Sequence, residues 1–469
     1  MAKLLGVTVL PEYIQSEGIE GVLGNLSDIG ANAVATSPYL MQEADRNTGQ
    51  REPPADADAG SVRLLDRPLF GKREVWVTTA PSFTPDLQLY AGLRYRPSVP
   101  TDLTREQGHI LRDFIGAAHD AGIKVYFQVQ AAIPPGYRVQ FGGPVESDRA
   151  RLPDGTIPER RLAKNGSLAS PHILAYEHAL IRDLLQNYPD LDGLRVDWPE
   201  YPPYFLDSAF LDFGYHAERE AERMGFPFER MRRDVGGLYA KLHGGLTDAD
   251  LEPWALDGDG GRYHLLRLLS DFPGVGAWLR FKAALVEDMI RGFRETMDEA
   301  GGQSVELLPN AFPPPWTIVS GMDFRRVARH SSAISCKLYT MHWPMMLRFY
   351  GDQILQANPG LSSELLAGAL VNLLDIADDS GLGSVEAYSY PPPDVPHPVG
   401  PSAQARKIRQ AQRDAGDTPV YVLAHGYGPL EDFRKRLQVA RDVGSHGYWV
   451  NRYAYLSDEK LSVIREVGV

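Results

Sequence analysis

Cysteine is almost absent from this chain. Cys336 is the one cysteine among 469 residues, so no intramolecular disulfide can form. This excludes a small disulfide-stapled fold and is typical of proteins of a reducing cytoplasm. Long apolar runs are absent too, because no stretch approaches the ~20 residues that a membrane-spanning helix requires. The apolar start, residues 4–10, is short and meets Pro11 and Glu12, which predicts a buried strand rather than a leader and favours a cytoplasmic location.

Basic residues are fewer than acidic residues. Lysine and arginine total 48 against 61 aspartates and glutamates, which gives a formal charge of -13. Such a chain has no general attraction for nucleic acid or anionic lipid, and we expect neither as a partner. Glycine-rich phosphate loops, cysteine pairs and His-x-x-x-His helices are absent, and the acidic run 256–261 lacks the twelve-residue calcium pattern. We therefore expect no cofactor and no metal, and we leave the oligomeric state open.

The sequence does contain a regular alternation of strand-like and helix-like segments. Eight short β-rich apolar segments recur, at residues 5–10, 32–37, 123–130, 192–197, 304–308, 333–339, 419–424 and 447–451. Apolar residues at helical spacing occupy residues 19–30, 104–121, 171–187, 208–242, 274–300, 344–357, 362–376, 430–443 and 457–467. This alternation predicts an α/β fold, a single (β/α)₈ TIM barrel over residues 1–469. The alternative, a doubly wound open sheet, expects a glycine-rich loop where this chain has Pro11-Glu12-Tyr13.

Long insertions are predicted after strands two, three, four and six. They span about residues 38–103, 131–170, 198–302 and 377–418. Each follows the carboxyl end of a strand, the face on which barrel active sites are built. With 22 tyrosines, 17 phenylalanines, 7 tryptophans and 36 prolines in the chain, we expect stiff, aromatic loops over a concave site.

Side chains alternate between the two faces of a strand, which indicates which residues point into the barrel. In strand 192–197 the apolar Leu194 and Val196 face the helices, so Arg195 and Asp197 point inward. The same reasoning over all strands and the residues just past their ends predicts a polar ring, formed by Glu12, Gln128, Arg195, Asp197, Glu306, Lys337, Tyr339, His425 and Asn451. Buried charges need partners, so this ring is either a functional site or an ion-pair network that fills the barrel.

The segment 192–201 carries the strongest chemical signal. Asp197 ends its strand, Arg195 lies on the same face and can fix its carboxylate, and Glu200 follows within one turn. The aromatic faces of Trp198 and Tyr201 suit stacking on sugar rings. Glycosidic cleavage needs two carboxylates, one to protonate the leaving oxygen and one to attack or to activate water.

We therefore predict a glycoside hydrolase whose substrate is a small carbohydrate or glycoside. Asp197 would be the nucleophile or charge stabiliser, and Glu306 or Glu200 the general acid/base, with Glu12 as a third candidate. His342, directly after the sixth strand, is predicted to contact sugar hydroxyls, as are the other polar residues of the ring. A retaining reaction requires carboxyl groups ~5–5.5 Å apart and an inverting one ~6.5–9.5 Å.

A resemblance agrees with this prediction. Gly193-Leu194-Arg195-Val196-Asp197 is similar to the Gly-x-Arg-x-Asp segment on the fourth barrel strand of the α-amylase superfamily, in which the Asp is the nucleophile. The wider stretch 165–233 resembles glycoside-hydrolase-like (β/α)₈ barrel families. Elsewhere the chain departs from α-amylases, since Gln128-Val129-Gln130 replaces their third-strand Asp and the residues that follow it. The resemblance implies a distant glycoside-hydrolase-like barrel with Asp197 in the nucleophile or stabiliser role.

Two other functions fit the same barrel. Lys337, inward on the sixth strand, suits the Schiff base of an aldolase, and Glu306 with Asp197 and a histidine suits a metal-dependent sugar isomerase or epimerase. A degenerate barrel that binds sugar without cleaving it is the third possibility.

Overall fold

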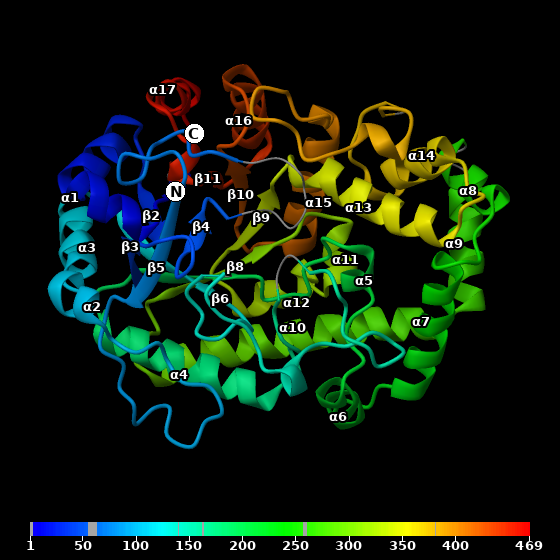
Figure 1. Ribbon diagram of the computed structural model, residues 1–469, viewed down its shortest axis with the longest axis horizontal. Coiled ribbons are helices and arrows are strands. Elements are labelled where there is room, and N and C mark those ends of the chain that lie inside the picture. Colours follow the sequence, from blue (N-terminus) through cyan, green and yellow to red (C-terminus); the bar gives the residue numbers. More distant parts are fainter. Residues whose placement is uncertain (1–2, 55–62, 139, 162–163, 257–259, 380) are drawn as a thin grey trace.

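The computed structural model describes residues 3–54, 63–138, 140–161, 164–256, 260–379 and 381–469 (Figure 1). Positions 257–259 of the acidic run lie outside these ranges. Eight strands close into a parallel barrel in the order β1-β11-β10-β9-β8-β7-β6-β2. Their bounds are β1 (Leu4–Thr8), β2 (Ala33–Thr36), β6 (Lys124–Gln130), β7 (Gly193–Asp197), β8 (Glu306–Ala311), β9 (Ile334–Leu338), β10 (Val420–His425) and β11 (Gly447–Asn451). The predicted (β/α)₈ TIM barrel is confirmed.

Helices surround the barrel on all sides (Figure 1). They include α1 (Pro11–Asp28), α3 (Ile110–Asp120), α4 (Pro171–Asn187), α10 (Gly274–Glu299), α13 (His342–Ala357), α14 (Ser363–Leu374), α16 (Leu430–Val443) and α17 (Asp458–Val467). The start of helix α4 follows from its sequence. The Ser170 side chain caps the helix by accepting a hydrogen bond from the amide of Ile173, and Pro171 occupies the first turn. In the described part of the chain, no helix combines the length and apolar character needed to cross a membrane.

Helix α1 begins eight residues earlier than the periodicity predicts. Pro11 stands at its first position, where a missing amide hydrogen costs nothing, and Gly18 breaks the helix with φ 77° and ψ 162°. The apolar spacing from residue 19 onward predicted only the second half of helix α1. Glu12 therefore lies in the first turn of α1, directly beyond the carboxyl end of β1.

Three of the predicted insertions contain regular structure. Residues 38–103 hold a small antiparallel sheet of β3 (Tyr39–Glu43), β5 (Val75–Pro81) and β4 (Gln50–Glu52), and then α2 (Asp102–Gln107). After β7 come α5 (Leu206–Ala209), α6 (Tyr215–Arg223), α7 (Phe228–Leu242), α8 (Asp248–Ala255) and α9 (Gly260–Asp271). Short helices α11 (Trp316–Ser320) and α12 (Phe324–Val327) follow β8. The small sheet and α15 (Pro401–Ala415) were expected to be loop, and α15 escaped detection because its exposed face is strongly polar.

Large side chains fill the barrel below its carboxyl end. The Trp449 ring occupies the space beside Gly6, where an added Cβ would lie 2.2 Å from the indole. The Arg195 guanidinium lies 4.3 Å from the centre of that ring, and Tyr126 meets it edge-on at 5.4 Å. This interior is packed as in other barrels, so a ligand can enter only above it.

Candidate functional site

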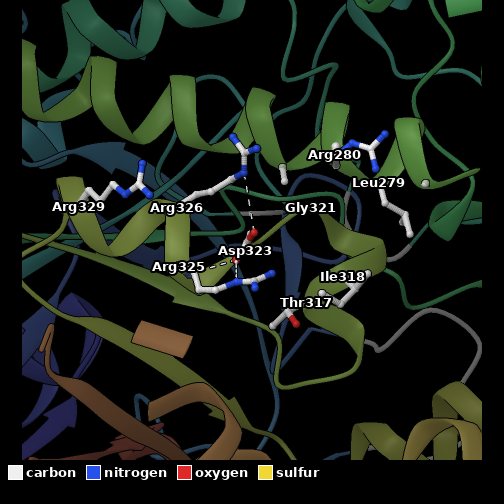
Figure 2. Close-up of a pocket in the computed structure, with 11 residues that line it drawn as sticks. Leu279, Arg280, Thr317, Ile318, Gly321, Asp323, Arg325, Arg326 and Arg329 are labelled. Atoms are coloured by element: carbon white, nitrogen blue, oxygen red, sulfur yellow. Dashed lines mark hydrogen bonds and ion pairs between the residues drawn. The ribbon is translucent and has the colours of Figure 1, made fainter. Parts of the chain in front are cut away.

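A cavity of about 390 Å³ opens at the carboxyl ends of the barrel strands. Its walls come from the ends of β1, β6, β7, β10 and β11 and from the loops that follow the strands. Of the predicted site residues, the cavity brings together Gln128, Asp197, Trp198, Tyr339, His342, His425 and Asn451. Its volume lies in the ~300–1,000 Å³ range of small-molecule sites. Larger hollows, of about 600, 450 and 730 Å³, lie among the outer helices and away from the strand ends (Figure 2 shows the first).

Asp197 is anchored on one side by a lysine. Its Oδ1 lies 2.7 Å from Nζ of Lys337 and accepts a hydrogen bond of 3.4 Å from Nδ2 of Asn310. Lys337 is buried in β9, and Asn310 belongs to β8, the strand between them in the barrel. Both contacts use the same oxygen, so Oδ2 is the carboxylate atom available to the cavity.

Arg195 contacts the Asp197 carboxylate only indirectly, through Asn310. Its guanidinium donates to Oγ1 of Thr8 at 3.1 Å and to Oδ1 of Asn310 at 3.3 Å, and burial lowers its pKa to about 10. The sequence predicted that Arg195 fixes the Asp197 carboxylate directly. In the structure Arg195 instead donates to Asn310, and Asn310 donates to Asp197. Lys337 is the cation that makes the direct contact, because β9 carries it to the height of Asp197, whereas Arg195 lies two residues lower on its strand.

Trp198 adopts a backbone conformation that bulky residues avoid. Its φ of 54° is left-handed, which costs a non-glycine residue ~1–3 kcal/mol unless the surroundings enforce it. The turn brings the indole into the cavity wall directly beside Asp197, edge-on to Tyr204 at 6.2 Å. Strain of this kind concentrates at functional sites, and here it presents an aromatic surface next to a carboxylate.

Glu200 and Tyr201 do not reach the cavity. Glu200 is fully buried and accepts hydrogen bonds from the Phe312 amide at 3.0 Å and from Oγ of Ser320 at 2.6 Å. Burial raises its pKa to about 7, although the nearby Lys337 opposes this shift. The Tyr201 hydroxyl donates to Asp212 at 3.2 Å, and its ring is enclosed by the interior. The chain turns inward after Pro199, so Glu200 contacts Ser320 of α11 and Tyr201 contacts Asp212, and neither side chain faces the barrel mouth.

Glu306 lies at the opposite end of the barrel from Asp197. It is the first residue of β8 and the register partner of Gly193, the first residue of β7, whereas Asp197 is the last. Four residues of strand separate the two positions by ~13 Å along the strand direction. Glu306 pairs with Nζ of Lys124 at 2.6 Å and accepts from the Tyr126 hydroxyl at 2.9 Å. The structure therefore does not support Glu306 as an acid/base, because β8 begins two residues later than the sequence predicted.

Glu12 belongs to a buried ion network under one wall of the cavity. Its carboxylate pairs with Arg138 at 3.1 Å and accepts from the Tyr39 hydroxyl at 2.9 Å. Glu52 binds both Arg138 and Arg452. Burial raises the pKa of Glu12, and Arg138 opposes that shift, whereas the two arginines outweigh burial and lower the pKa of Glu52.

Arg138 and Arg452 are also lining residues of the cavity, together with Arg63 and Lys164. Sequence reasoning missed these four cations. Arg63, Arg138 and Lys164 come from irregular segments, in which no periodicity indicates direction. Arg452 follows β11, so its position past a strand end was the one signal available.

The histidines of the cavity wall are held in defined orientations. Nδ1 of His425 accepts the amide hydrogen of Tyr427 at 3.0 Å, so its proton resides on Nε2. Burial, assisted by Arg63, keeps the pKa of His425 well below its usual value, and the ring is a neutral hydrogen-bond donor. Nδ1 of His342 lies 3.4 Å from the Tyr204 hydroxyl.

No family model and no curated protein matches this chain. Solved structures do. The β-galactosidase of the psychrophilic Marinomonas ef1 matches 99% of this chain at 11% identity with a TM-score of 0.50, and that of the haloarchaeon Halorubrum lacusprofundi matches 99% at 14% identity, also with 0.50. The chain spans 58% and 57% of those two proteins. At these identities the likeness shows a shared barrel fold.

Proposed function

We propose that this protein is a carbohydrate-active enzyme that hydrolyses a glycosidic bond, with Asp197 as the carboxylate at the reacting carbon. One observation carries the proposal: Asp197 reaches the cavity from a strand end, fixed 2.7 Å from Lys337 and flanked by the Trp198 ring. A fixed carboxylate that faces the anomeric carbon is one of the two groups that glycosidic cleavage uses. Two β-galactosidases share the fold, which places galactosides in the test panel.

In this proposal the two oxygens of Asp197 have different tasks. Oδ1 is held by Lys337 and Asn310, and Oδ2 faces the sugar. Oδ2 would form a bond to the anomeric carbon as the bond to the leaving oxygen breaks, or would stabilise the positive charge that develops there. Water then releases the sugar and restores the carboxylate. Neutral His425, donating from Nε2, and the amides of Gln128 and Asn451 would bind sugar hydroxyls.

Glu200 acts through Lys337 in this account and does not touch the substrate. Its buried carboxyl interacts electrostatically with the Lys337 ammonium, which in turn contacts Asp197. Among the cavity residues that the structure describes, Asp197 is the one carboxylate. Glycosides whose leaving group needs no protonation, such as 4-nitrophenyl glycosides, therefore report the chemistry of Asp197 most directly.

The test is hydrolysis of 4-nitrophenyl glucosides, galactosides, glucuronides and N-acetylglucosaminides by the full chain. Asp197→Asn is expected to lower kcat/KM by about 10³-fold or more on a substrate that the wild type cleaves. Asp352→Asn, which breaks an exposed ion pair to Arg348 on α13, is the matched control and keeps full activity. Wild-type activity in the Asp197→Asn variant would show that the assignment is wrong.

A second candidate function is sugar binding without cleavage. It is favoured by the single carboxylate among the described cavity residues, since acid-assisted hydrolysis uses two. It predicts that the wild type binds sugars and leaves every aryl glycoside intact. The aldolase and metal-isomerase alternatives have less support, because Lys337 is engaged by Asp197 and Glu306 lies far from it.

A further inference from the structure

A cluster of metal-binding residue types lies apart from the barrel cavity, at a point where two insertions meet a barrel helix. It consists of Asp148, His172 and His216. Asp148 ends η1 (Glu146–Asp148) in the insertion after β6, His172 is the second residue of α4, and His216 is the second residue of α6. One carboxylate oxygen and one nitrogen of each imidazole lie within 4.8 Å of one another. These three residues do not line the cavity that contains Asp197.

Asp148 is a fully buried carboxylate in a fixed orientation. Its Oδ2 accepts hydrogen bonds from the Tyr95 hydroxyl at 2.7 Å and from Nη1 of Arg94 at 3.0 Å, and its Oδ1 accepts one from the Ser170 hydroxyl at 3.0 Å. Burial favours the protonated form, but the hydrogen bonds outweigh burial and lower the pKa of Asp148 below its usual value. The group is therefore ionised, and its neighbours hold it in the way that outer-shell hydrogen bonds hold the carboxylate ligands of metal sites.

The fourth hydrogen bond of Asp148 comes from His216 and can be exchanged for a metal ion. Nε2 of His216 lies 2.8 Å from Oδ1, and because an ionised carboxylate only accepts, the proton resides on Nε2. In the other neutral tautomer the proton resides on Nδ1, and Nε2 and Oδ1 then direct lone pairs to the same point. Two ligands ~2.0–2.1 Å from a tetrahedral zinc ion are ~3.3 Å apart, so a displacement of about half an ångström converts this hydrogen bond into two metal bonds. The contacts of Asp148 with Tyr95, Arg94 and Ser170 stay as they are.

His172 supplies a lone pair that no described protein group uses. Its ring meets the His216 ring edge-on at 5.8 Å between centres, and its nitrogens form no hydrogen bond or ion pair with the residues that the structure describes. A neutral imidazole has one unprotonated nitrogen, so this lone pair is available to an ion. By comparison, His119 pairs with Asp192 at 2.8 Å, and within the described ranges that pair belongs to no such three-residue group. The cluster is distinguished by its second, unpaired histidine.

We propose that Asp148, His172 and His216 bind a divalent transition metal ion, and that the ion is zinc. Two imidazoles and one carboxylate form a typical zinc ligand set, whereas calcium and magnesium prefer oxygen ligands throughout. Three protein ligands leave the fourth tetrahedral position to water. The ion would join η1, α4 and α6, and so fasten the insertions after β6 and β7 to a helix of the barrel. Because the ligands come from three separate segments, no spacing motif in the sequence predicted them.

The experiment is titration calorimetry of the full chain with zinc, calcium and magnesium chloride. The protein is first freed of metal with EDTA and transferred to chelator-free buffer at about pH 7.5, where histidine is neutral. One zinc ion per chain is expected to bind with a Kd of about 1 µM or tighter, and calcium and magnesium at least about 100-fold more weakly. Zinc should also raise the midpoint of thermal unfolding, because an ion that binds only the folded state stabilises it.

Variants locate the ion. His172→Ala removes a ligand without breaking a described hydrogen bond, so it should fold as the wild type does and bind zinc about 100-fold more weakly or not at all. His216→Ala repeats the test with a second ligand. His119→Ala, the matched control, breaks an unrelated 2.8 Å contact with a carboxylate and should keep the wild-type affinity. Arg94→Gln removes a positive charge 3.0 Å from Oδ2 of Asp148 and should tighten zinc binding about threefold or more.

The outcomes that reject the site are equally specific. Undetectable zinc binding, a preference for calcium or magnesium, or wild-type affinity in His172→Ala would overturn the inference, as would equal losses in His172→Ala and His119→Ala. Because the cluster lies outside the cavity, the aryl-glycoside assays of Asp197→Asn and these titrations succeed or fail independently.

Discussion

The ammonium of Lys337 lies 2.7 Å from Oδ1 of Asp197, and the two residues come from β9 and β7, which are not adjacent in the barrel. Asn310, from the strand between them, contacts the same oxygen. This contact orients the one carboxylate among the described residues that line the cavity. Much of the proposed chemistry depends on it.

Replacement of Lys337 by methionine should harm both stability and activity. The change removes the partner of a largely buried carboxylate, and we expect a loss of about 3 kcal/mol in the free energy of unfolding. Urea denaturation measures this loss. The control is Lys124→Met, which breaks the more exposed pair with Glu306 at the other end of the barrel and should cost less than about 1 kcal/mol. Equal losses in the two variants would contradict the account.

Glu200 should make stability depend on pH. Burial raises its pKa from 4.5 to about 7, so between these values the folded protein keeps a proton that the unfolded chain releases. The unfolded state then binds fewer protons, and the free energy of unfolding falls as pH rises through this window. In Glu200→Gln that contribution is absent. The stability of wild type relative to the variant should decrease by about 3 kcal/mol between pH 4.5 and pH 7.5, and a constant difference across this range would refute the shift.

Two substitutions of Trp198 distinguish the effect of its backbone strain from that of its ring. Glycine tolerates the φ of 54° and alanine does not, so Trp198→Gly should be about 1 kcal/mol more stable than Trp198→Ala. Both variants lose the indole from the cavity wall and should bind sugar more weakly than wild type. Thermal unfolding ranks the stabilities, and calorimetry measures the binding. A more stable alanine variant would mean that the left-handed turn is not present.

Gly6 tests the packing of the barrel interior. A Cβ at this position would lie 2.2 Å from the Trp449 ring, so Gly6→Ala should destabilise the protein by about 2 kcal/mol or more. Gly116→Ala on α3, where nothing lies within 4 Å of an added Cβ, should instead stabilise it by roughly 0.5–1 kcal/mol. Chemical denaturation of the pair gives opposite signs if the interior is as described.

The alternation of strand-like and helix-like segments was sufficient to predict the fold, and the alternation of side chains along the strands predicted which residues point into the barrel. Asp197 and Lys337 occupy inward positions near the carboxyl ends of their strands, and the structure brings them into contact. The same rule placed Glu306 inward but at the wrong height, because side-chain period indicates a face and not where a strand begins. An error of two residues at the start of β8 was enough to move it to the opposite end.

The rest of the site depends on residues of the insertions. Glu52 and Arg138 come from two different insertions and meet beneath the cavity wall, far apart in the sequence. Glu52 ends the three-residue strand β4, which is too short to show a period, and Arg138 lies in irregular chain, so nothing local in the sequence indicates that they are neighbours. Tyr201 was misplaced for a related reason, since the turn after Trp198 carries it into the interior and not toward the cavity.

The most direct test of the central claim, that Asp197 reacts at the anomeric carbon, is chemical rescue of Asp197→Ala. The variant should be nearly inactive on the best 4-nitrophenyl glycoside of the wild type, because alanine leaves a space and no nucleophile. Added azide should restore cleavage about tenfold or more and yield a glycosyl azide, detected by mass spectrometry. Wild-type activity in the variant, or azide that neither accelerates cleavage nor appears in the product, would contradict the claim.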